Sequence, residues 1–76
     1  MPSIASLEIG QRAIIKDFSV EVVPLKLLEM GCLPGNEVVL IQEAPFKDPL
    51  YLTINGSHLA IRKEMACKIE IELIDG

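Results

Sequence analysis

Aromatic residues are scarce in this chain of 76 residues, which contains two phenylalanines, one tyrosine and no tryptophan. Domains that recognise proline-rich peptides dock them in aromatic-lined grooves. Because Phe18, Phe46 and Tyr51 are the complete aromatic set, a polyproline-binding role is disfavoured. A protein partner is expected to meet an aliphatic surface or a sheet edge instead.

Basic residues are also in short supply, since seven lysines and arginines stand against eleven aspartates and glutamates, for a formal net charge of −4. Nucleic acids are bound mainly through Lys and Arg that neutralise phosphates, and anionic membrane surfaces attract basic clusters. Arg62-Lys63 is the only adjacent basic pair. The sequence therefore predicts that neither nucleic acid nor an anionic membrane surface is a partner.

Long apolar runs are missing as well. The longest uninterrupted one is Val38-Val39-Leu40-Ile41, far below the roughly 18 residues of a membrane-spanning helix, and no signal peptide opens the chain. We expect a cytoplasmic protein with no direct membrane insertion. The length predicts one domain, residues 1–76, with a small core and little room for a catalytic cleft or a nucleotide-sized cofactor.

Residues suited to catalysis or metal binding are few. Cys32, Cys67 and His58 are the only soft metal ligands, and none has a partner at a ligand spacing such as C-x₂-C or H-x₃-H. Both cysteines are expected to be reduced core residues, and His58 is expected to face solvent. A Cys–His nucleophile pair and an arginine finger from Arg12 or Arg62 stay open as alternatives, although no catalytic or phosphate-binding motif supports them. The sequence thus predicts no enzyme, no cofactor and no metal site.

Alternating and β-branched apolar segments predict a mostly β fold with about five short strands. These strands are expected at residues 12–18, 37–43, 50–54, 57–62 and 68–73. Asn55-Gly56 predicts a two-residue type I′ hairpin turn. Residues 44–49 are expected to form a loop, and residues 63–66 a single helical turn before the last strand.

Five strands of this length suggest a small, strongly bent sheet or barrel rather than a sandwich of seven or more strands. The apolar centre of residues 37–43 is expected to be covered on both faces. In the segment before the first strand, Ile4, Leu7 and Ile9 are expected to pack against the domain.

One stretch, Leu25 to Gly35 with Pro24 before it, predicts a short helix followed by a turn instead of a strand. Pro24 suits the first helical position, Gly31 suits the left-handed position that ends a helix, and Pro34-Gly35 predicts a turn. Two turns of helix are too short to be stable alone in water. The helix must therefore lie on the rest of the domain.

The side chains of this helix are apolar over a wide arc. Leu25, Leu27, Leu28 and Met30 span about 220°, whereas a surface helix needs a stripe of only about 100° or slightly more to face a core. Leu27 and Leu28 are expected to plug the domain. Leu25 and Met30, at the margins of the arc, and Leu33 in the following turn are the predicted partner contacts. The alternative is that all three belong to the core.

Several short motifs occur in order along nearly the whole chain. They are Leu7-x-x-Gly10, the run from Leu27 to Gly35, Ala44-Pro45, Asp48-Pro49, Asn55-Gly56, the run from Leu59 to Arg62, and the run from Glu64 to Ile69. None of them is specific alone. In this order and at these spacings, the chain resembles the FeoA family of small cytoplasmic proteins associated with bacterial ferrous iron uptake.

The resemblance implies an SH3-like β-barrel with the helix inserted after the first strand. It also implies a non-enzymatic accessory role beside FeoB, the membrane transporter with a cytoplasmic GTP-binding domain, on which this protein would dock. A similar barrel in iron-dependent repressors leaves the alternative of a module that binds or senses ferrous iron through Cys32, His58 or carboxylates. Met1 indicates a complete chain without the repressors' DNA-binding domain. Strand edges and surplus aliphatic residues would also allow weak homo-oligomers.

Overall fold

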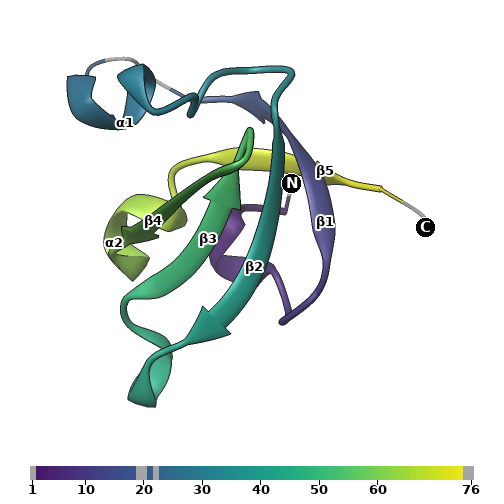
Figure 1. Ribbon diagram of the computed structural model, residues 1–76, viewed down its shortest axis with the longest axis vertical. Helices are drawn as coiled ribbons and strands as arrows, with labels where there is room; N and C mark the ends of the chain where they lie inside the picture. Colours follow the sequence, from purple (N-terminus) through teal and green to yellow (C-terminus); the bar gives the residue numbers. More distant parts are fainter. Residues whose placement is uncertain (1, 19–20, 22, 75–76) are drawn as a thin grey trace.

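Five antiparallel strands form a single, strongly bent sheet in the order β4-β3-β2-β1-β5 (Figure 1). The strands are β1 Arg12–Asp17, β2 Glu37–Glu43, β3 Leu50–Ile54, β4 Ser57–Ile61 and β5 Glu70–Leu73. Two short α-helices, α1 Leu25–Glu29 and α2 Lys63–Ala66, and two 3₁₀ turns, η1 Ile4–Ser6 and η2 Pro45–Lys47, complete the fold. This computed structural model describes residues 2–18, 21 and 23–74. The predicted mostly β class, the five strands and both helices are confirmed.

Strand ends differ from the prediction where other elements intervene. β4 ends at Ile61, one residue early, because Arg62 is the N-cap of α2. β5 begins at Glu70, two residues late, because the N–H of Lys68 still closes the turn of α2. The predicted loop at residues 44–49 contains η2. Residues 19, 20 and 22, in the segment predicted to connect the first strand to the first helix, lie outside the described residues.

No helix in the described part of the chain is long and apolar enough to cross a membrane.

β3 and β4 form the predicted hairpin. Asn55 and Gly56 both have a positive φ, at 51° and 84°, as a type I′ turn requires. Ile54 pairs with Ser57 directly across the turn, and the register runs on regularly to the far end of β4. This register leaves alternate backbone groups of β4 on the outer side of the strand.

The core is made of apolar side chains from every strand and from the segments that cover them. Ile4 and Leu7 are buried in it, as predicted, but Ile9 is exposed. The prediction for Ile9 is wrong because the chain turns at Gly10, whose N–H bonds to the carbonyl oxygen of Leu40 at 2.8 Å, and this turn directs Ile9 outward. The buried residues are Ile4, Leu7, Ala13, Ile15, Val23, Cys32, Val38, Leu40, Leu50, Leu52, Ile54, Ile61, Ala66, Ile69 and Ile71.

The prediction that the centre of β2 is covered on both faces is wrong at Ile41, whose side chain is exposed. Val38 and Leu40 are buried, but the register against β3 shifts between Leu40 and Gln42. An irregularity of this kind leaves a residue without a cross-strand partner and bends the strand. Ile41 is the residue left over, and it points to solvent.

The two edge strands of the sheet differ in how they are covered. Along β5, Ser3 forms a bridge to Glu70, and the N–H of Ile71 donates to the carbonyl oxygen of Pro2 at 3.0 Å. None of the described segments pairs with the outer edge of β4. The sheet is therefore open within the described residues, and the edge of β4 is free.

Candidate functional site

Helix α1 and the turn after it form the surface predicted to bind a partner. Pro24 is the N-cap of α1 and has an extended backbone, so the prediction that it takes the first helical position is wrong by one residue. Its carbonyl oxygen accepts the N–H of Leu27 at 3.0 Å. Gly31 has a φ of 101° and ends the helix as predicted, because glycine adopts this conformation without strain.

The turn after α1 is anchored to the sheet. Asn36 donates a side-chain N–H to the carbonyl oxygen of Gly31 at 2.6 Å, and its backbone N–H to that of Leu33 at 3.1 Å. The N–H of Gly35 bonds to the carbonyl oxygen of Ile15 in β1 at 2.8 Å. These bonds fix the conformation of the backbone around Leu33, and therefore the direction in which its side chain leaves the turn.

The side chains of the three predicted contact residues differ in how far they are exposed to solvent. Leu25 is 69% exposed and Leu33 is 44% exposed, whereas Met30 is half-buried. The alternative that all three belong to the core is therefore wrong for Leu25 and Leu33. Leu27 and Leu28 pack against the core, as predicted, but their side chains are only half-buried. No residue of α1 is fully buried.

A groove of about 280 Å³ lies beside this surface, between α1, β4 and α2. Its lining residues are Pro24, Lys26, Leu27, Ala60, Ile61, Arg62, Glu64 and Met65. The sequence does not predict this groove, because its walls come from three elements that are far apart along the chain. The sequence does indicate that Leu27 and Met65 lie on helices too short to be stable alone, so both helices must pack on other parts of the chain.

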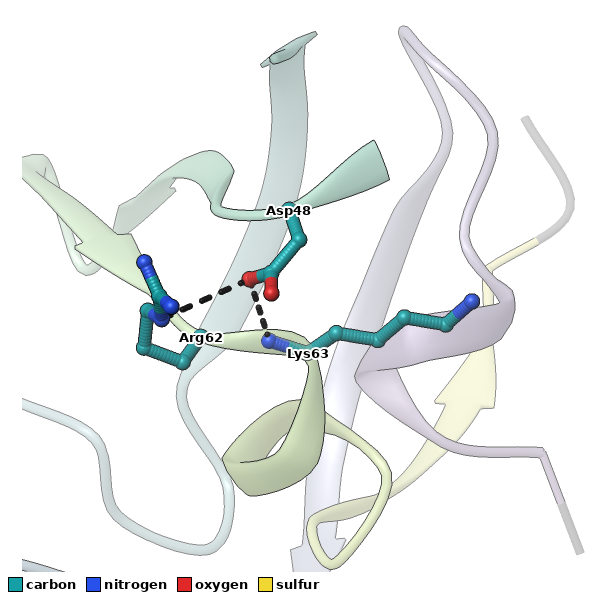
Figure 2. Close-up of polar contacts among 3 residues, drawn as sticks. All are labelled: Asp48, Arg62 and Lys63. Carbon is teal, nitrogen blue, oxygen red and sulfur yellow. Dashed lines mark hydrogen bonds and ion pairs between the residues drawn. The ribbon is translucent and has the colours of Figure 1, made fainter. Parts of the chain in front are cut away.

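Asp48 ties the loop before β3 to the start of α2 (Figure 2). Its Oδ1 accepts the backbone N–H of Lys63, the first residue of α2, at 3.0 Å and lies 3.7 Å from Nε of Arg62. The first N–H groups of a helix have no partner within the helix, and Asp48 supplies one. Arg62, which directly follows β4 and lines the groove, is paired with this carboxylate.

The residues suited to metal binding or nucleophilic chemistry occupy different environments. Cys32 is buried, and burial raises the pKa of its thiol. Cys67 is exposed, so the prediction that it is a core residue is wrong, and its Sγ donates to the carbonyl oxygen of Glu64 at 3.1 Å. His58 is exposed on β4, as predicted. Among the residues that the structure describes, no group of three or more His, Cys, Asp or Glu side chains is placed to hold a metal ion.

The two arginines considered for phosphate chemistry are in surface ion pairs. Nε of Arg12 lies 3.6 Å from a carboxylate oxygen of Glu37 on the adjacent strand, and Arg62 is paired with Asp48. Both arginine side chains are more than half exposed, and pairs of this kind contribute little to stability. Both arginines are therefore exposed surface residues.

Solved structures of other proteins share this fold. The solution structure of iron(II) transport protein A from Clostridium thermocellum superposes with a TM-score of 0.86 at 35% identity, over 96% of this chain and 46% of that chain. The crystal structure of Stenotrophomonas maltophilia FeoA complexed with zinc, described as a procaryotic SH3 domain protein, gives a TM-score of 0.74 over 95% of this chain and 91% of that chain. At 19% identity this second likeness shows the fold alone, which is SH3-like as expected.

Sequence comparison leads to the same family. A protein of Porphyromonas gingivalis (strain ATCC BAA-308 / W83), named as a fusion of Fe(2+) transport protein A with Fe(2+) transporter FeoB, is 43% identical over 49 residues. These residues are 64% of this chain but only 6% of that protein, so the chain spans a small part of this relative. A family model described as the FeoA domain matches residues 3–73. The chain therefore belongs to the FeoA family.

Proposed function

We propose that this chain is an accessory protein of ferrous iron uptake, which docks on the cytoplasmic GTP-binding part of a FeoB-type transporter and changes its assembly or its GTPase cycle. The observation that carries the proposal is the exposed apolar surface of α1 and its turn, formed by Leu25 and Leu33 with Met30 at its margin. The partner is suggested by the fusion relative, in which one chain joins both proteins. Docking at that place requires a cytoplasmic location.

Exposure of these leucines is unfavourable for the isolated chain. A leucine left in water forgoes the roughly 1.5–3 kcal/mol that burial of its side chain provides. The backbone that carries Leu33 is already fixed by the bonds of Gly35 and Asn36, so little conformational freedom is lost on binding. Leucines on a short helix and its turn suit an apolar groove on a partner, as in other helix-in-groove complexes.

We infer a binding role for this chain rather than catalysis. General acid–base chemistry needs titratable groups that face one pocket in suitable protonation states. In the groove beside α1 the titratable lining residues are Lys26, Arg62 and Glu64, and Arg62 is already paired with Asp48. Such a lining supports contact with a partner better than it supports proton transfer.

The proposal is tested with the purified cytoplasmic domain of a FeoB-type transporter from the same organism. Binding is measured by calorimetry without nucleotide, with GDP and with a non-hydrolysable GTP analogue, and GTP hydrolysis is followed with and without this protein. Saturable binding together with a changed hydrolysis rate supports the proposal, and absence of binding in every nucleotide state contradicts it. An anaerobic titration of the chain alone with ferrous iron tests the alternative of direct metal binding.

A further inference from the structure

We propose that the free edge of β4 and the groove beside it bind an extended segment of the partner as a sixth strand of the sheet. The inference rests on the proposed function for the partner, but it concerns a surface different from Leu25 and Leu33. The segment is defined by its chemistry. It offers backbone hydrogen-bonding groups along one side, apolar side chains at alternate positions, and a carboxylate.

The hairpin register decides which backbone groups of β4 are free. In an antiparallel pair, hydrogen-bonded and non-hydrogen-bonded residue pairs alternate, and the pair that closes a two-residue hairpin turn is hydrogen-bonded. Ser57, Leu59 and Ile61 therefore bond to β3. The N–H and C=O groups of His58 and Ala60 point to the other side, where they meet no pairing partner among the described residues.

The sequence of β4 does not protect this edge. Exposed edges in natural proteins usually carry charged side chains or proline, or are covered, because free backbone groups pair readily with other chains. β4 reads Ser-His-Leu-Ala-Ile, without Lys, Arg, Asp, Glu or Pro, whereas β5 is covered by Pro2 and Ser3. An uncovered edge that lacks Lys, Arg, Asp, Glu and Pro is suited to strand addition.

The groove beside the edge supplies side-chain contacts for an added strand. Successive side chains of a strand point to opposite faces, so every second residue of the segment would lie on the same side as Ile61. On that side the groove is walled by Leu27 of α1 and Met65 of α2. The bound segment is therefore expected to carry apolar residues at alternate positions.

Lys26 gives the groove one cationic group with which an anionic group on the bound segment can pair. Lys26 and Arg62 line the groove, and Glu64 is its one acidic lining residue. Arg62 is paired with Asp48, but Lys26 makes no ion pair with any residue in the described ranges. A carboxylate of the segment would give the Lys26 ammonium a partner while the aliphatic part of Lys26 continues to line the groove.

A second copy of this chain is the less suitable occupant. Specific interfaces bury about 800 Å² on each partner, which is roughly a sixth of the 4711 Å² surface of this chain. An edge with outward-facing backbone at His58 and Ala60 offers far less, and copies that each carry a net charge of −4 repel one another. A segment tethered to a partner already docked on α1 gains affinity from its high effective concentration instead.

Hydrogen exchange of the β4 amides tests the proposal without any substitution. The amides of His58 and Ala60 are expected to exchange rapidly in the free protein, and at least about tenfold more slowly when the transporter's cytoplasmic domain is bound. The amides of Leu59 and Ile61 should be protected in both states. Unchanged exchange at His58 and Ala60 in a complex that does form overturns this inference and leaves the proposed function standing. Absence of any complex overturns both.

The same measurement distinguishes a second copy from a partner segment. If the His58 and Ala60 amides exchange more slowly as the concentration of free protein rises, and light scattering shows a dimer, the edge binds another copy of the chain. That result overturns the proposal. Exchange that is independent of protein concentration until the transporter domain is added supports it.

A matched pair of variants tests the contribution of one backbone N–H. Ala60→Pro removes an outward N–H that makes no bond to β3, at the kind of edge position where proline is tolerated, whereas Ala60→Val keeps it. Synthetic peptides that tile the transporter's cytoplasmic segments are the probes. A peptide with alternate apolar residues and a carboxylate is expected to bind wild type and Ala60→Val. The same peptide is expected to bind Ala60→Pro at least about tenfold more weakly. Equal affinities for folded variants overturn the proposal, and if Ala60→Pro does not fold, the exchange measurement decides.

Discussion

At the scale of single residues, Gly31 shows how closely the chain at the end of α1 approaches the β3–β4 turn. Its φ is 101°, and a Cβ at this position would lie 3.2 Å from Cβ of Asn55 in the β3–β4 turn. That separation is shorter than an ordinary van der Waals contact. Glycine therefore serves twice, because it adopts the left-handed conformation that ends the helix and leaves room for the hairpin.

Gly31→Ala is expected to lower the free energy of unfolding by about 1–3 kcal/mol, because alanine is strained at this φ and its Cβ crowds Asn55. Gly35→Ala is the matched control, since Gly35 has a φ of 95° but no atom within 4 Å of its Cβ position. Urea denaturation should show Gly31→Ala to be the more destabilised variant. Equal losses would mean that the approach to Asn55 has no effect on stability.

The two cysteines should differ in reactivity, because the thiolate is the reactive form and access to it is required. Burial raises the pKa of Cys32, whereas Cys67 is exposed. A chromogenic disulfide at neutral pH should react with one thiol in the native protein and with two in denaturant, and Cys67→Ser should abolish the native reaction. Rapid native reaction of both thiols would contradict the burial of Cys32.

Burial of Cys32 also predicts how stability changes at alkaline pH. Because its pKa is raised above the ordinary value of 9.0, the folded state keeps a proton that the unfolded state begins to lose near that pH. The contribution of Cys32 to stability is complete below that pH and declines as the pH rises above it. Urea denaturation at a series of pH values should show a shallower alkaline decline for Cys32→Ala than for wild type. Identical slopes would contradict the raised pKa.

At the scale of elements, Asp48 couples the loop before β3 to α2. Asp48→Ala is expected to lower the free energy of unfolding by about 1 kcal/mol, because the N–H of Lys63 loses its acceptor. Asp48→Asn is the control, since an amide oxygen can still accept this N–H and loss of the exposed ion pair with Arg62 has little effect. Thermal unfolding should place Asp48→Asn close to wild type. Equal destabilisation of both variants would assign the effect to the ion pair instead.

The elements that the sequence predicts correctly are those with a local chemical signal. Alternation and β-branching identify β2 and β3, and Asn55-Gly56 identifies the hairpin turn. The errors at Ile9 and Ile41 have non-local causes. The turn that exposes Ile9 is held by a carbonyl group of β2, and the irregularity that exposes Ile41 is a register shift against β3.

The candidate site is predictable only in part. The wide apolar arc of the first helix indicates correctly that the core cannot take every leucine, and Leu25 is the one most clearly left outside. The prediction for Cys67 fails because this residue is the C-cap of α2, in a turn that faces solvent. The groove cannot be predicted, because its walls come from α1, β4 and α2, which only the folded chain brings together.

At the scale of the whole molecule, the two proposed binding surfaces are neighbours. The extents of the molecule are only 27 × 26 × 24 Å, and α1 contributes to both surfaces, through Leu25 to the exposed one and through Leu27 to the groove. A partner bound on the outer side of α1 would therefore hold its own flanking segments close to the edge of β4. We therefore expect a single partner to bind both surfaces at once.

We propose that the exposed leucines of α1 and its turn bind the transporter's cytoplasmic domain, and a calorimetric series with variants of these leucines tests this binding. The series compares wild type with Leu25→Ser/Leu33→Ser and with Leu73→Ser, whose leucine on β5 is 45% exposed and serves as the matched control. We expect similar melting temperatures for all proteins, unchanged affinity for Leu73→Ser, and affinity at least about tenfold lower, or roughly 1.4 kcal/mol, for the double variant. Wild-type affinity in the double variant would contradict the claim.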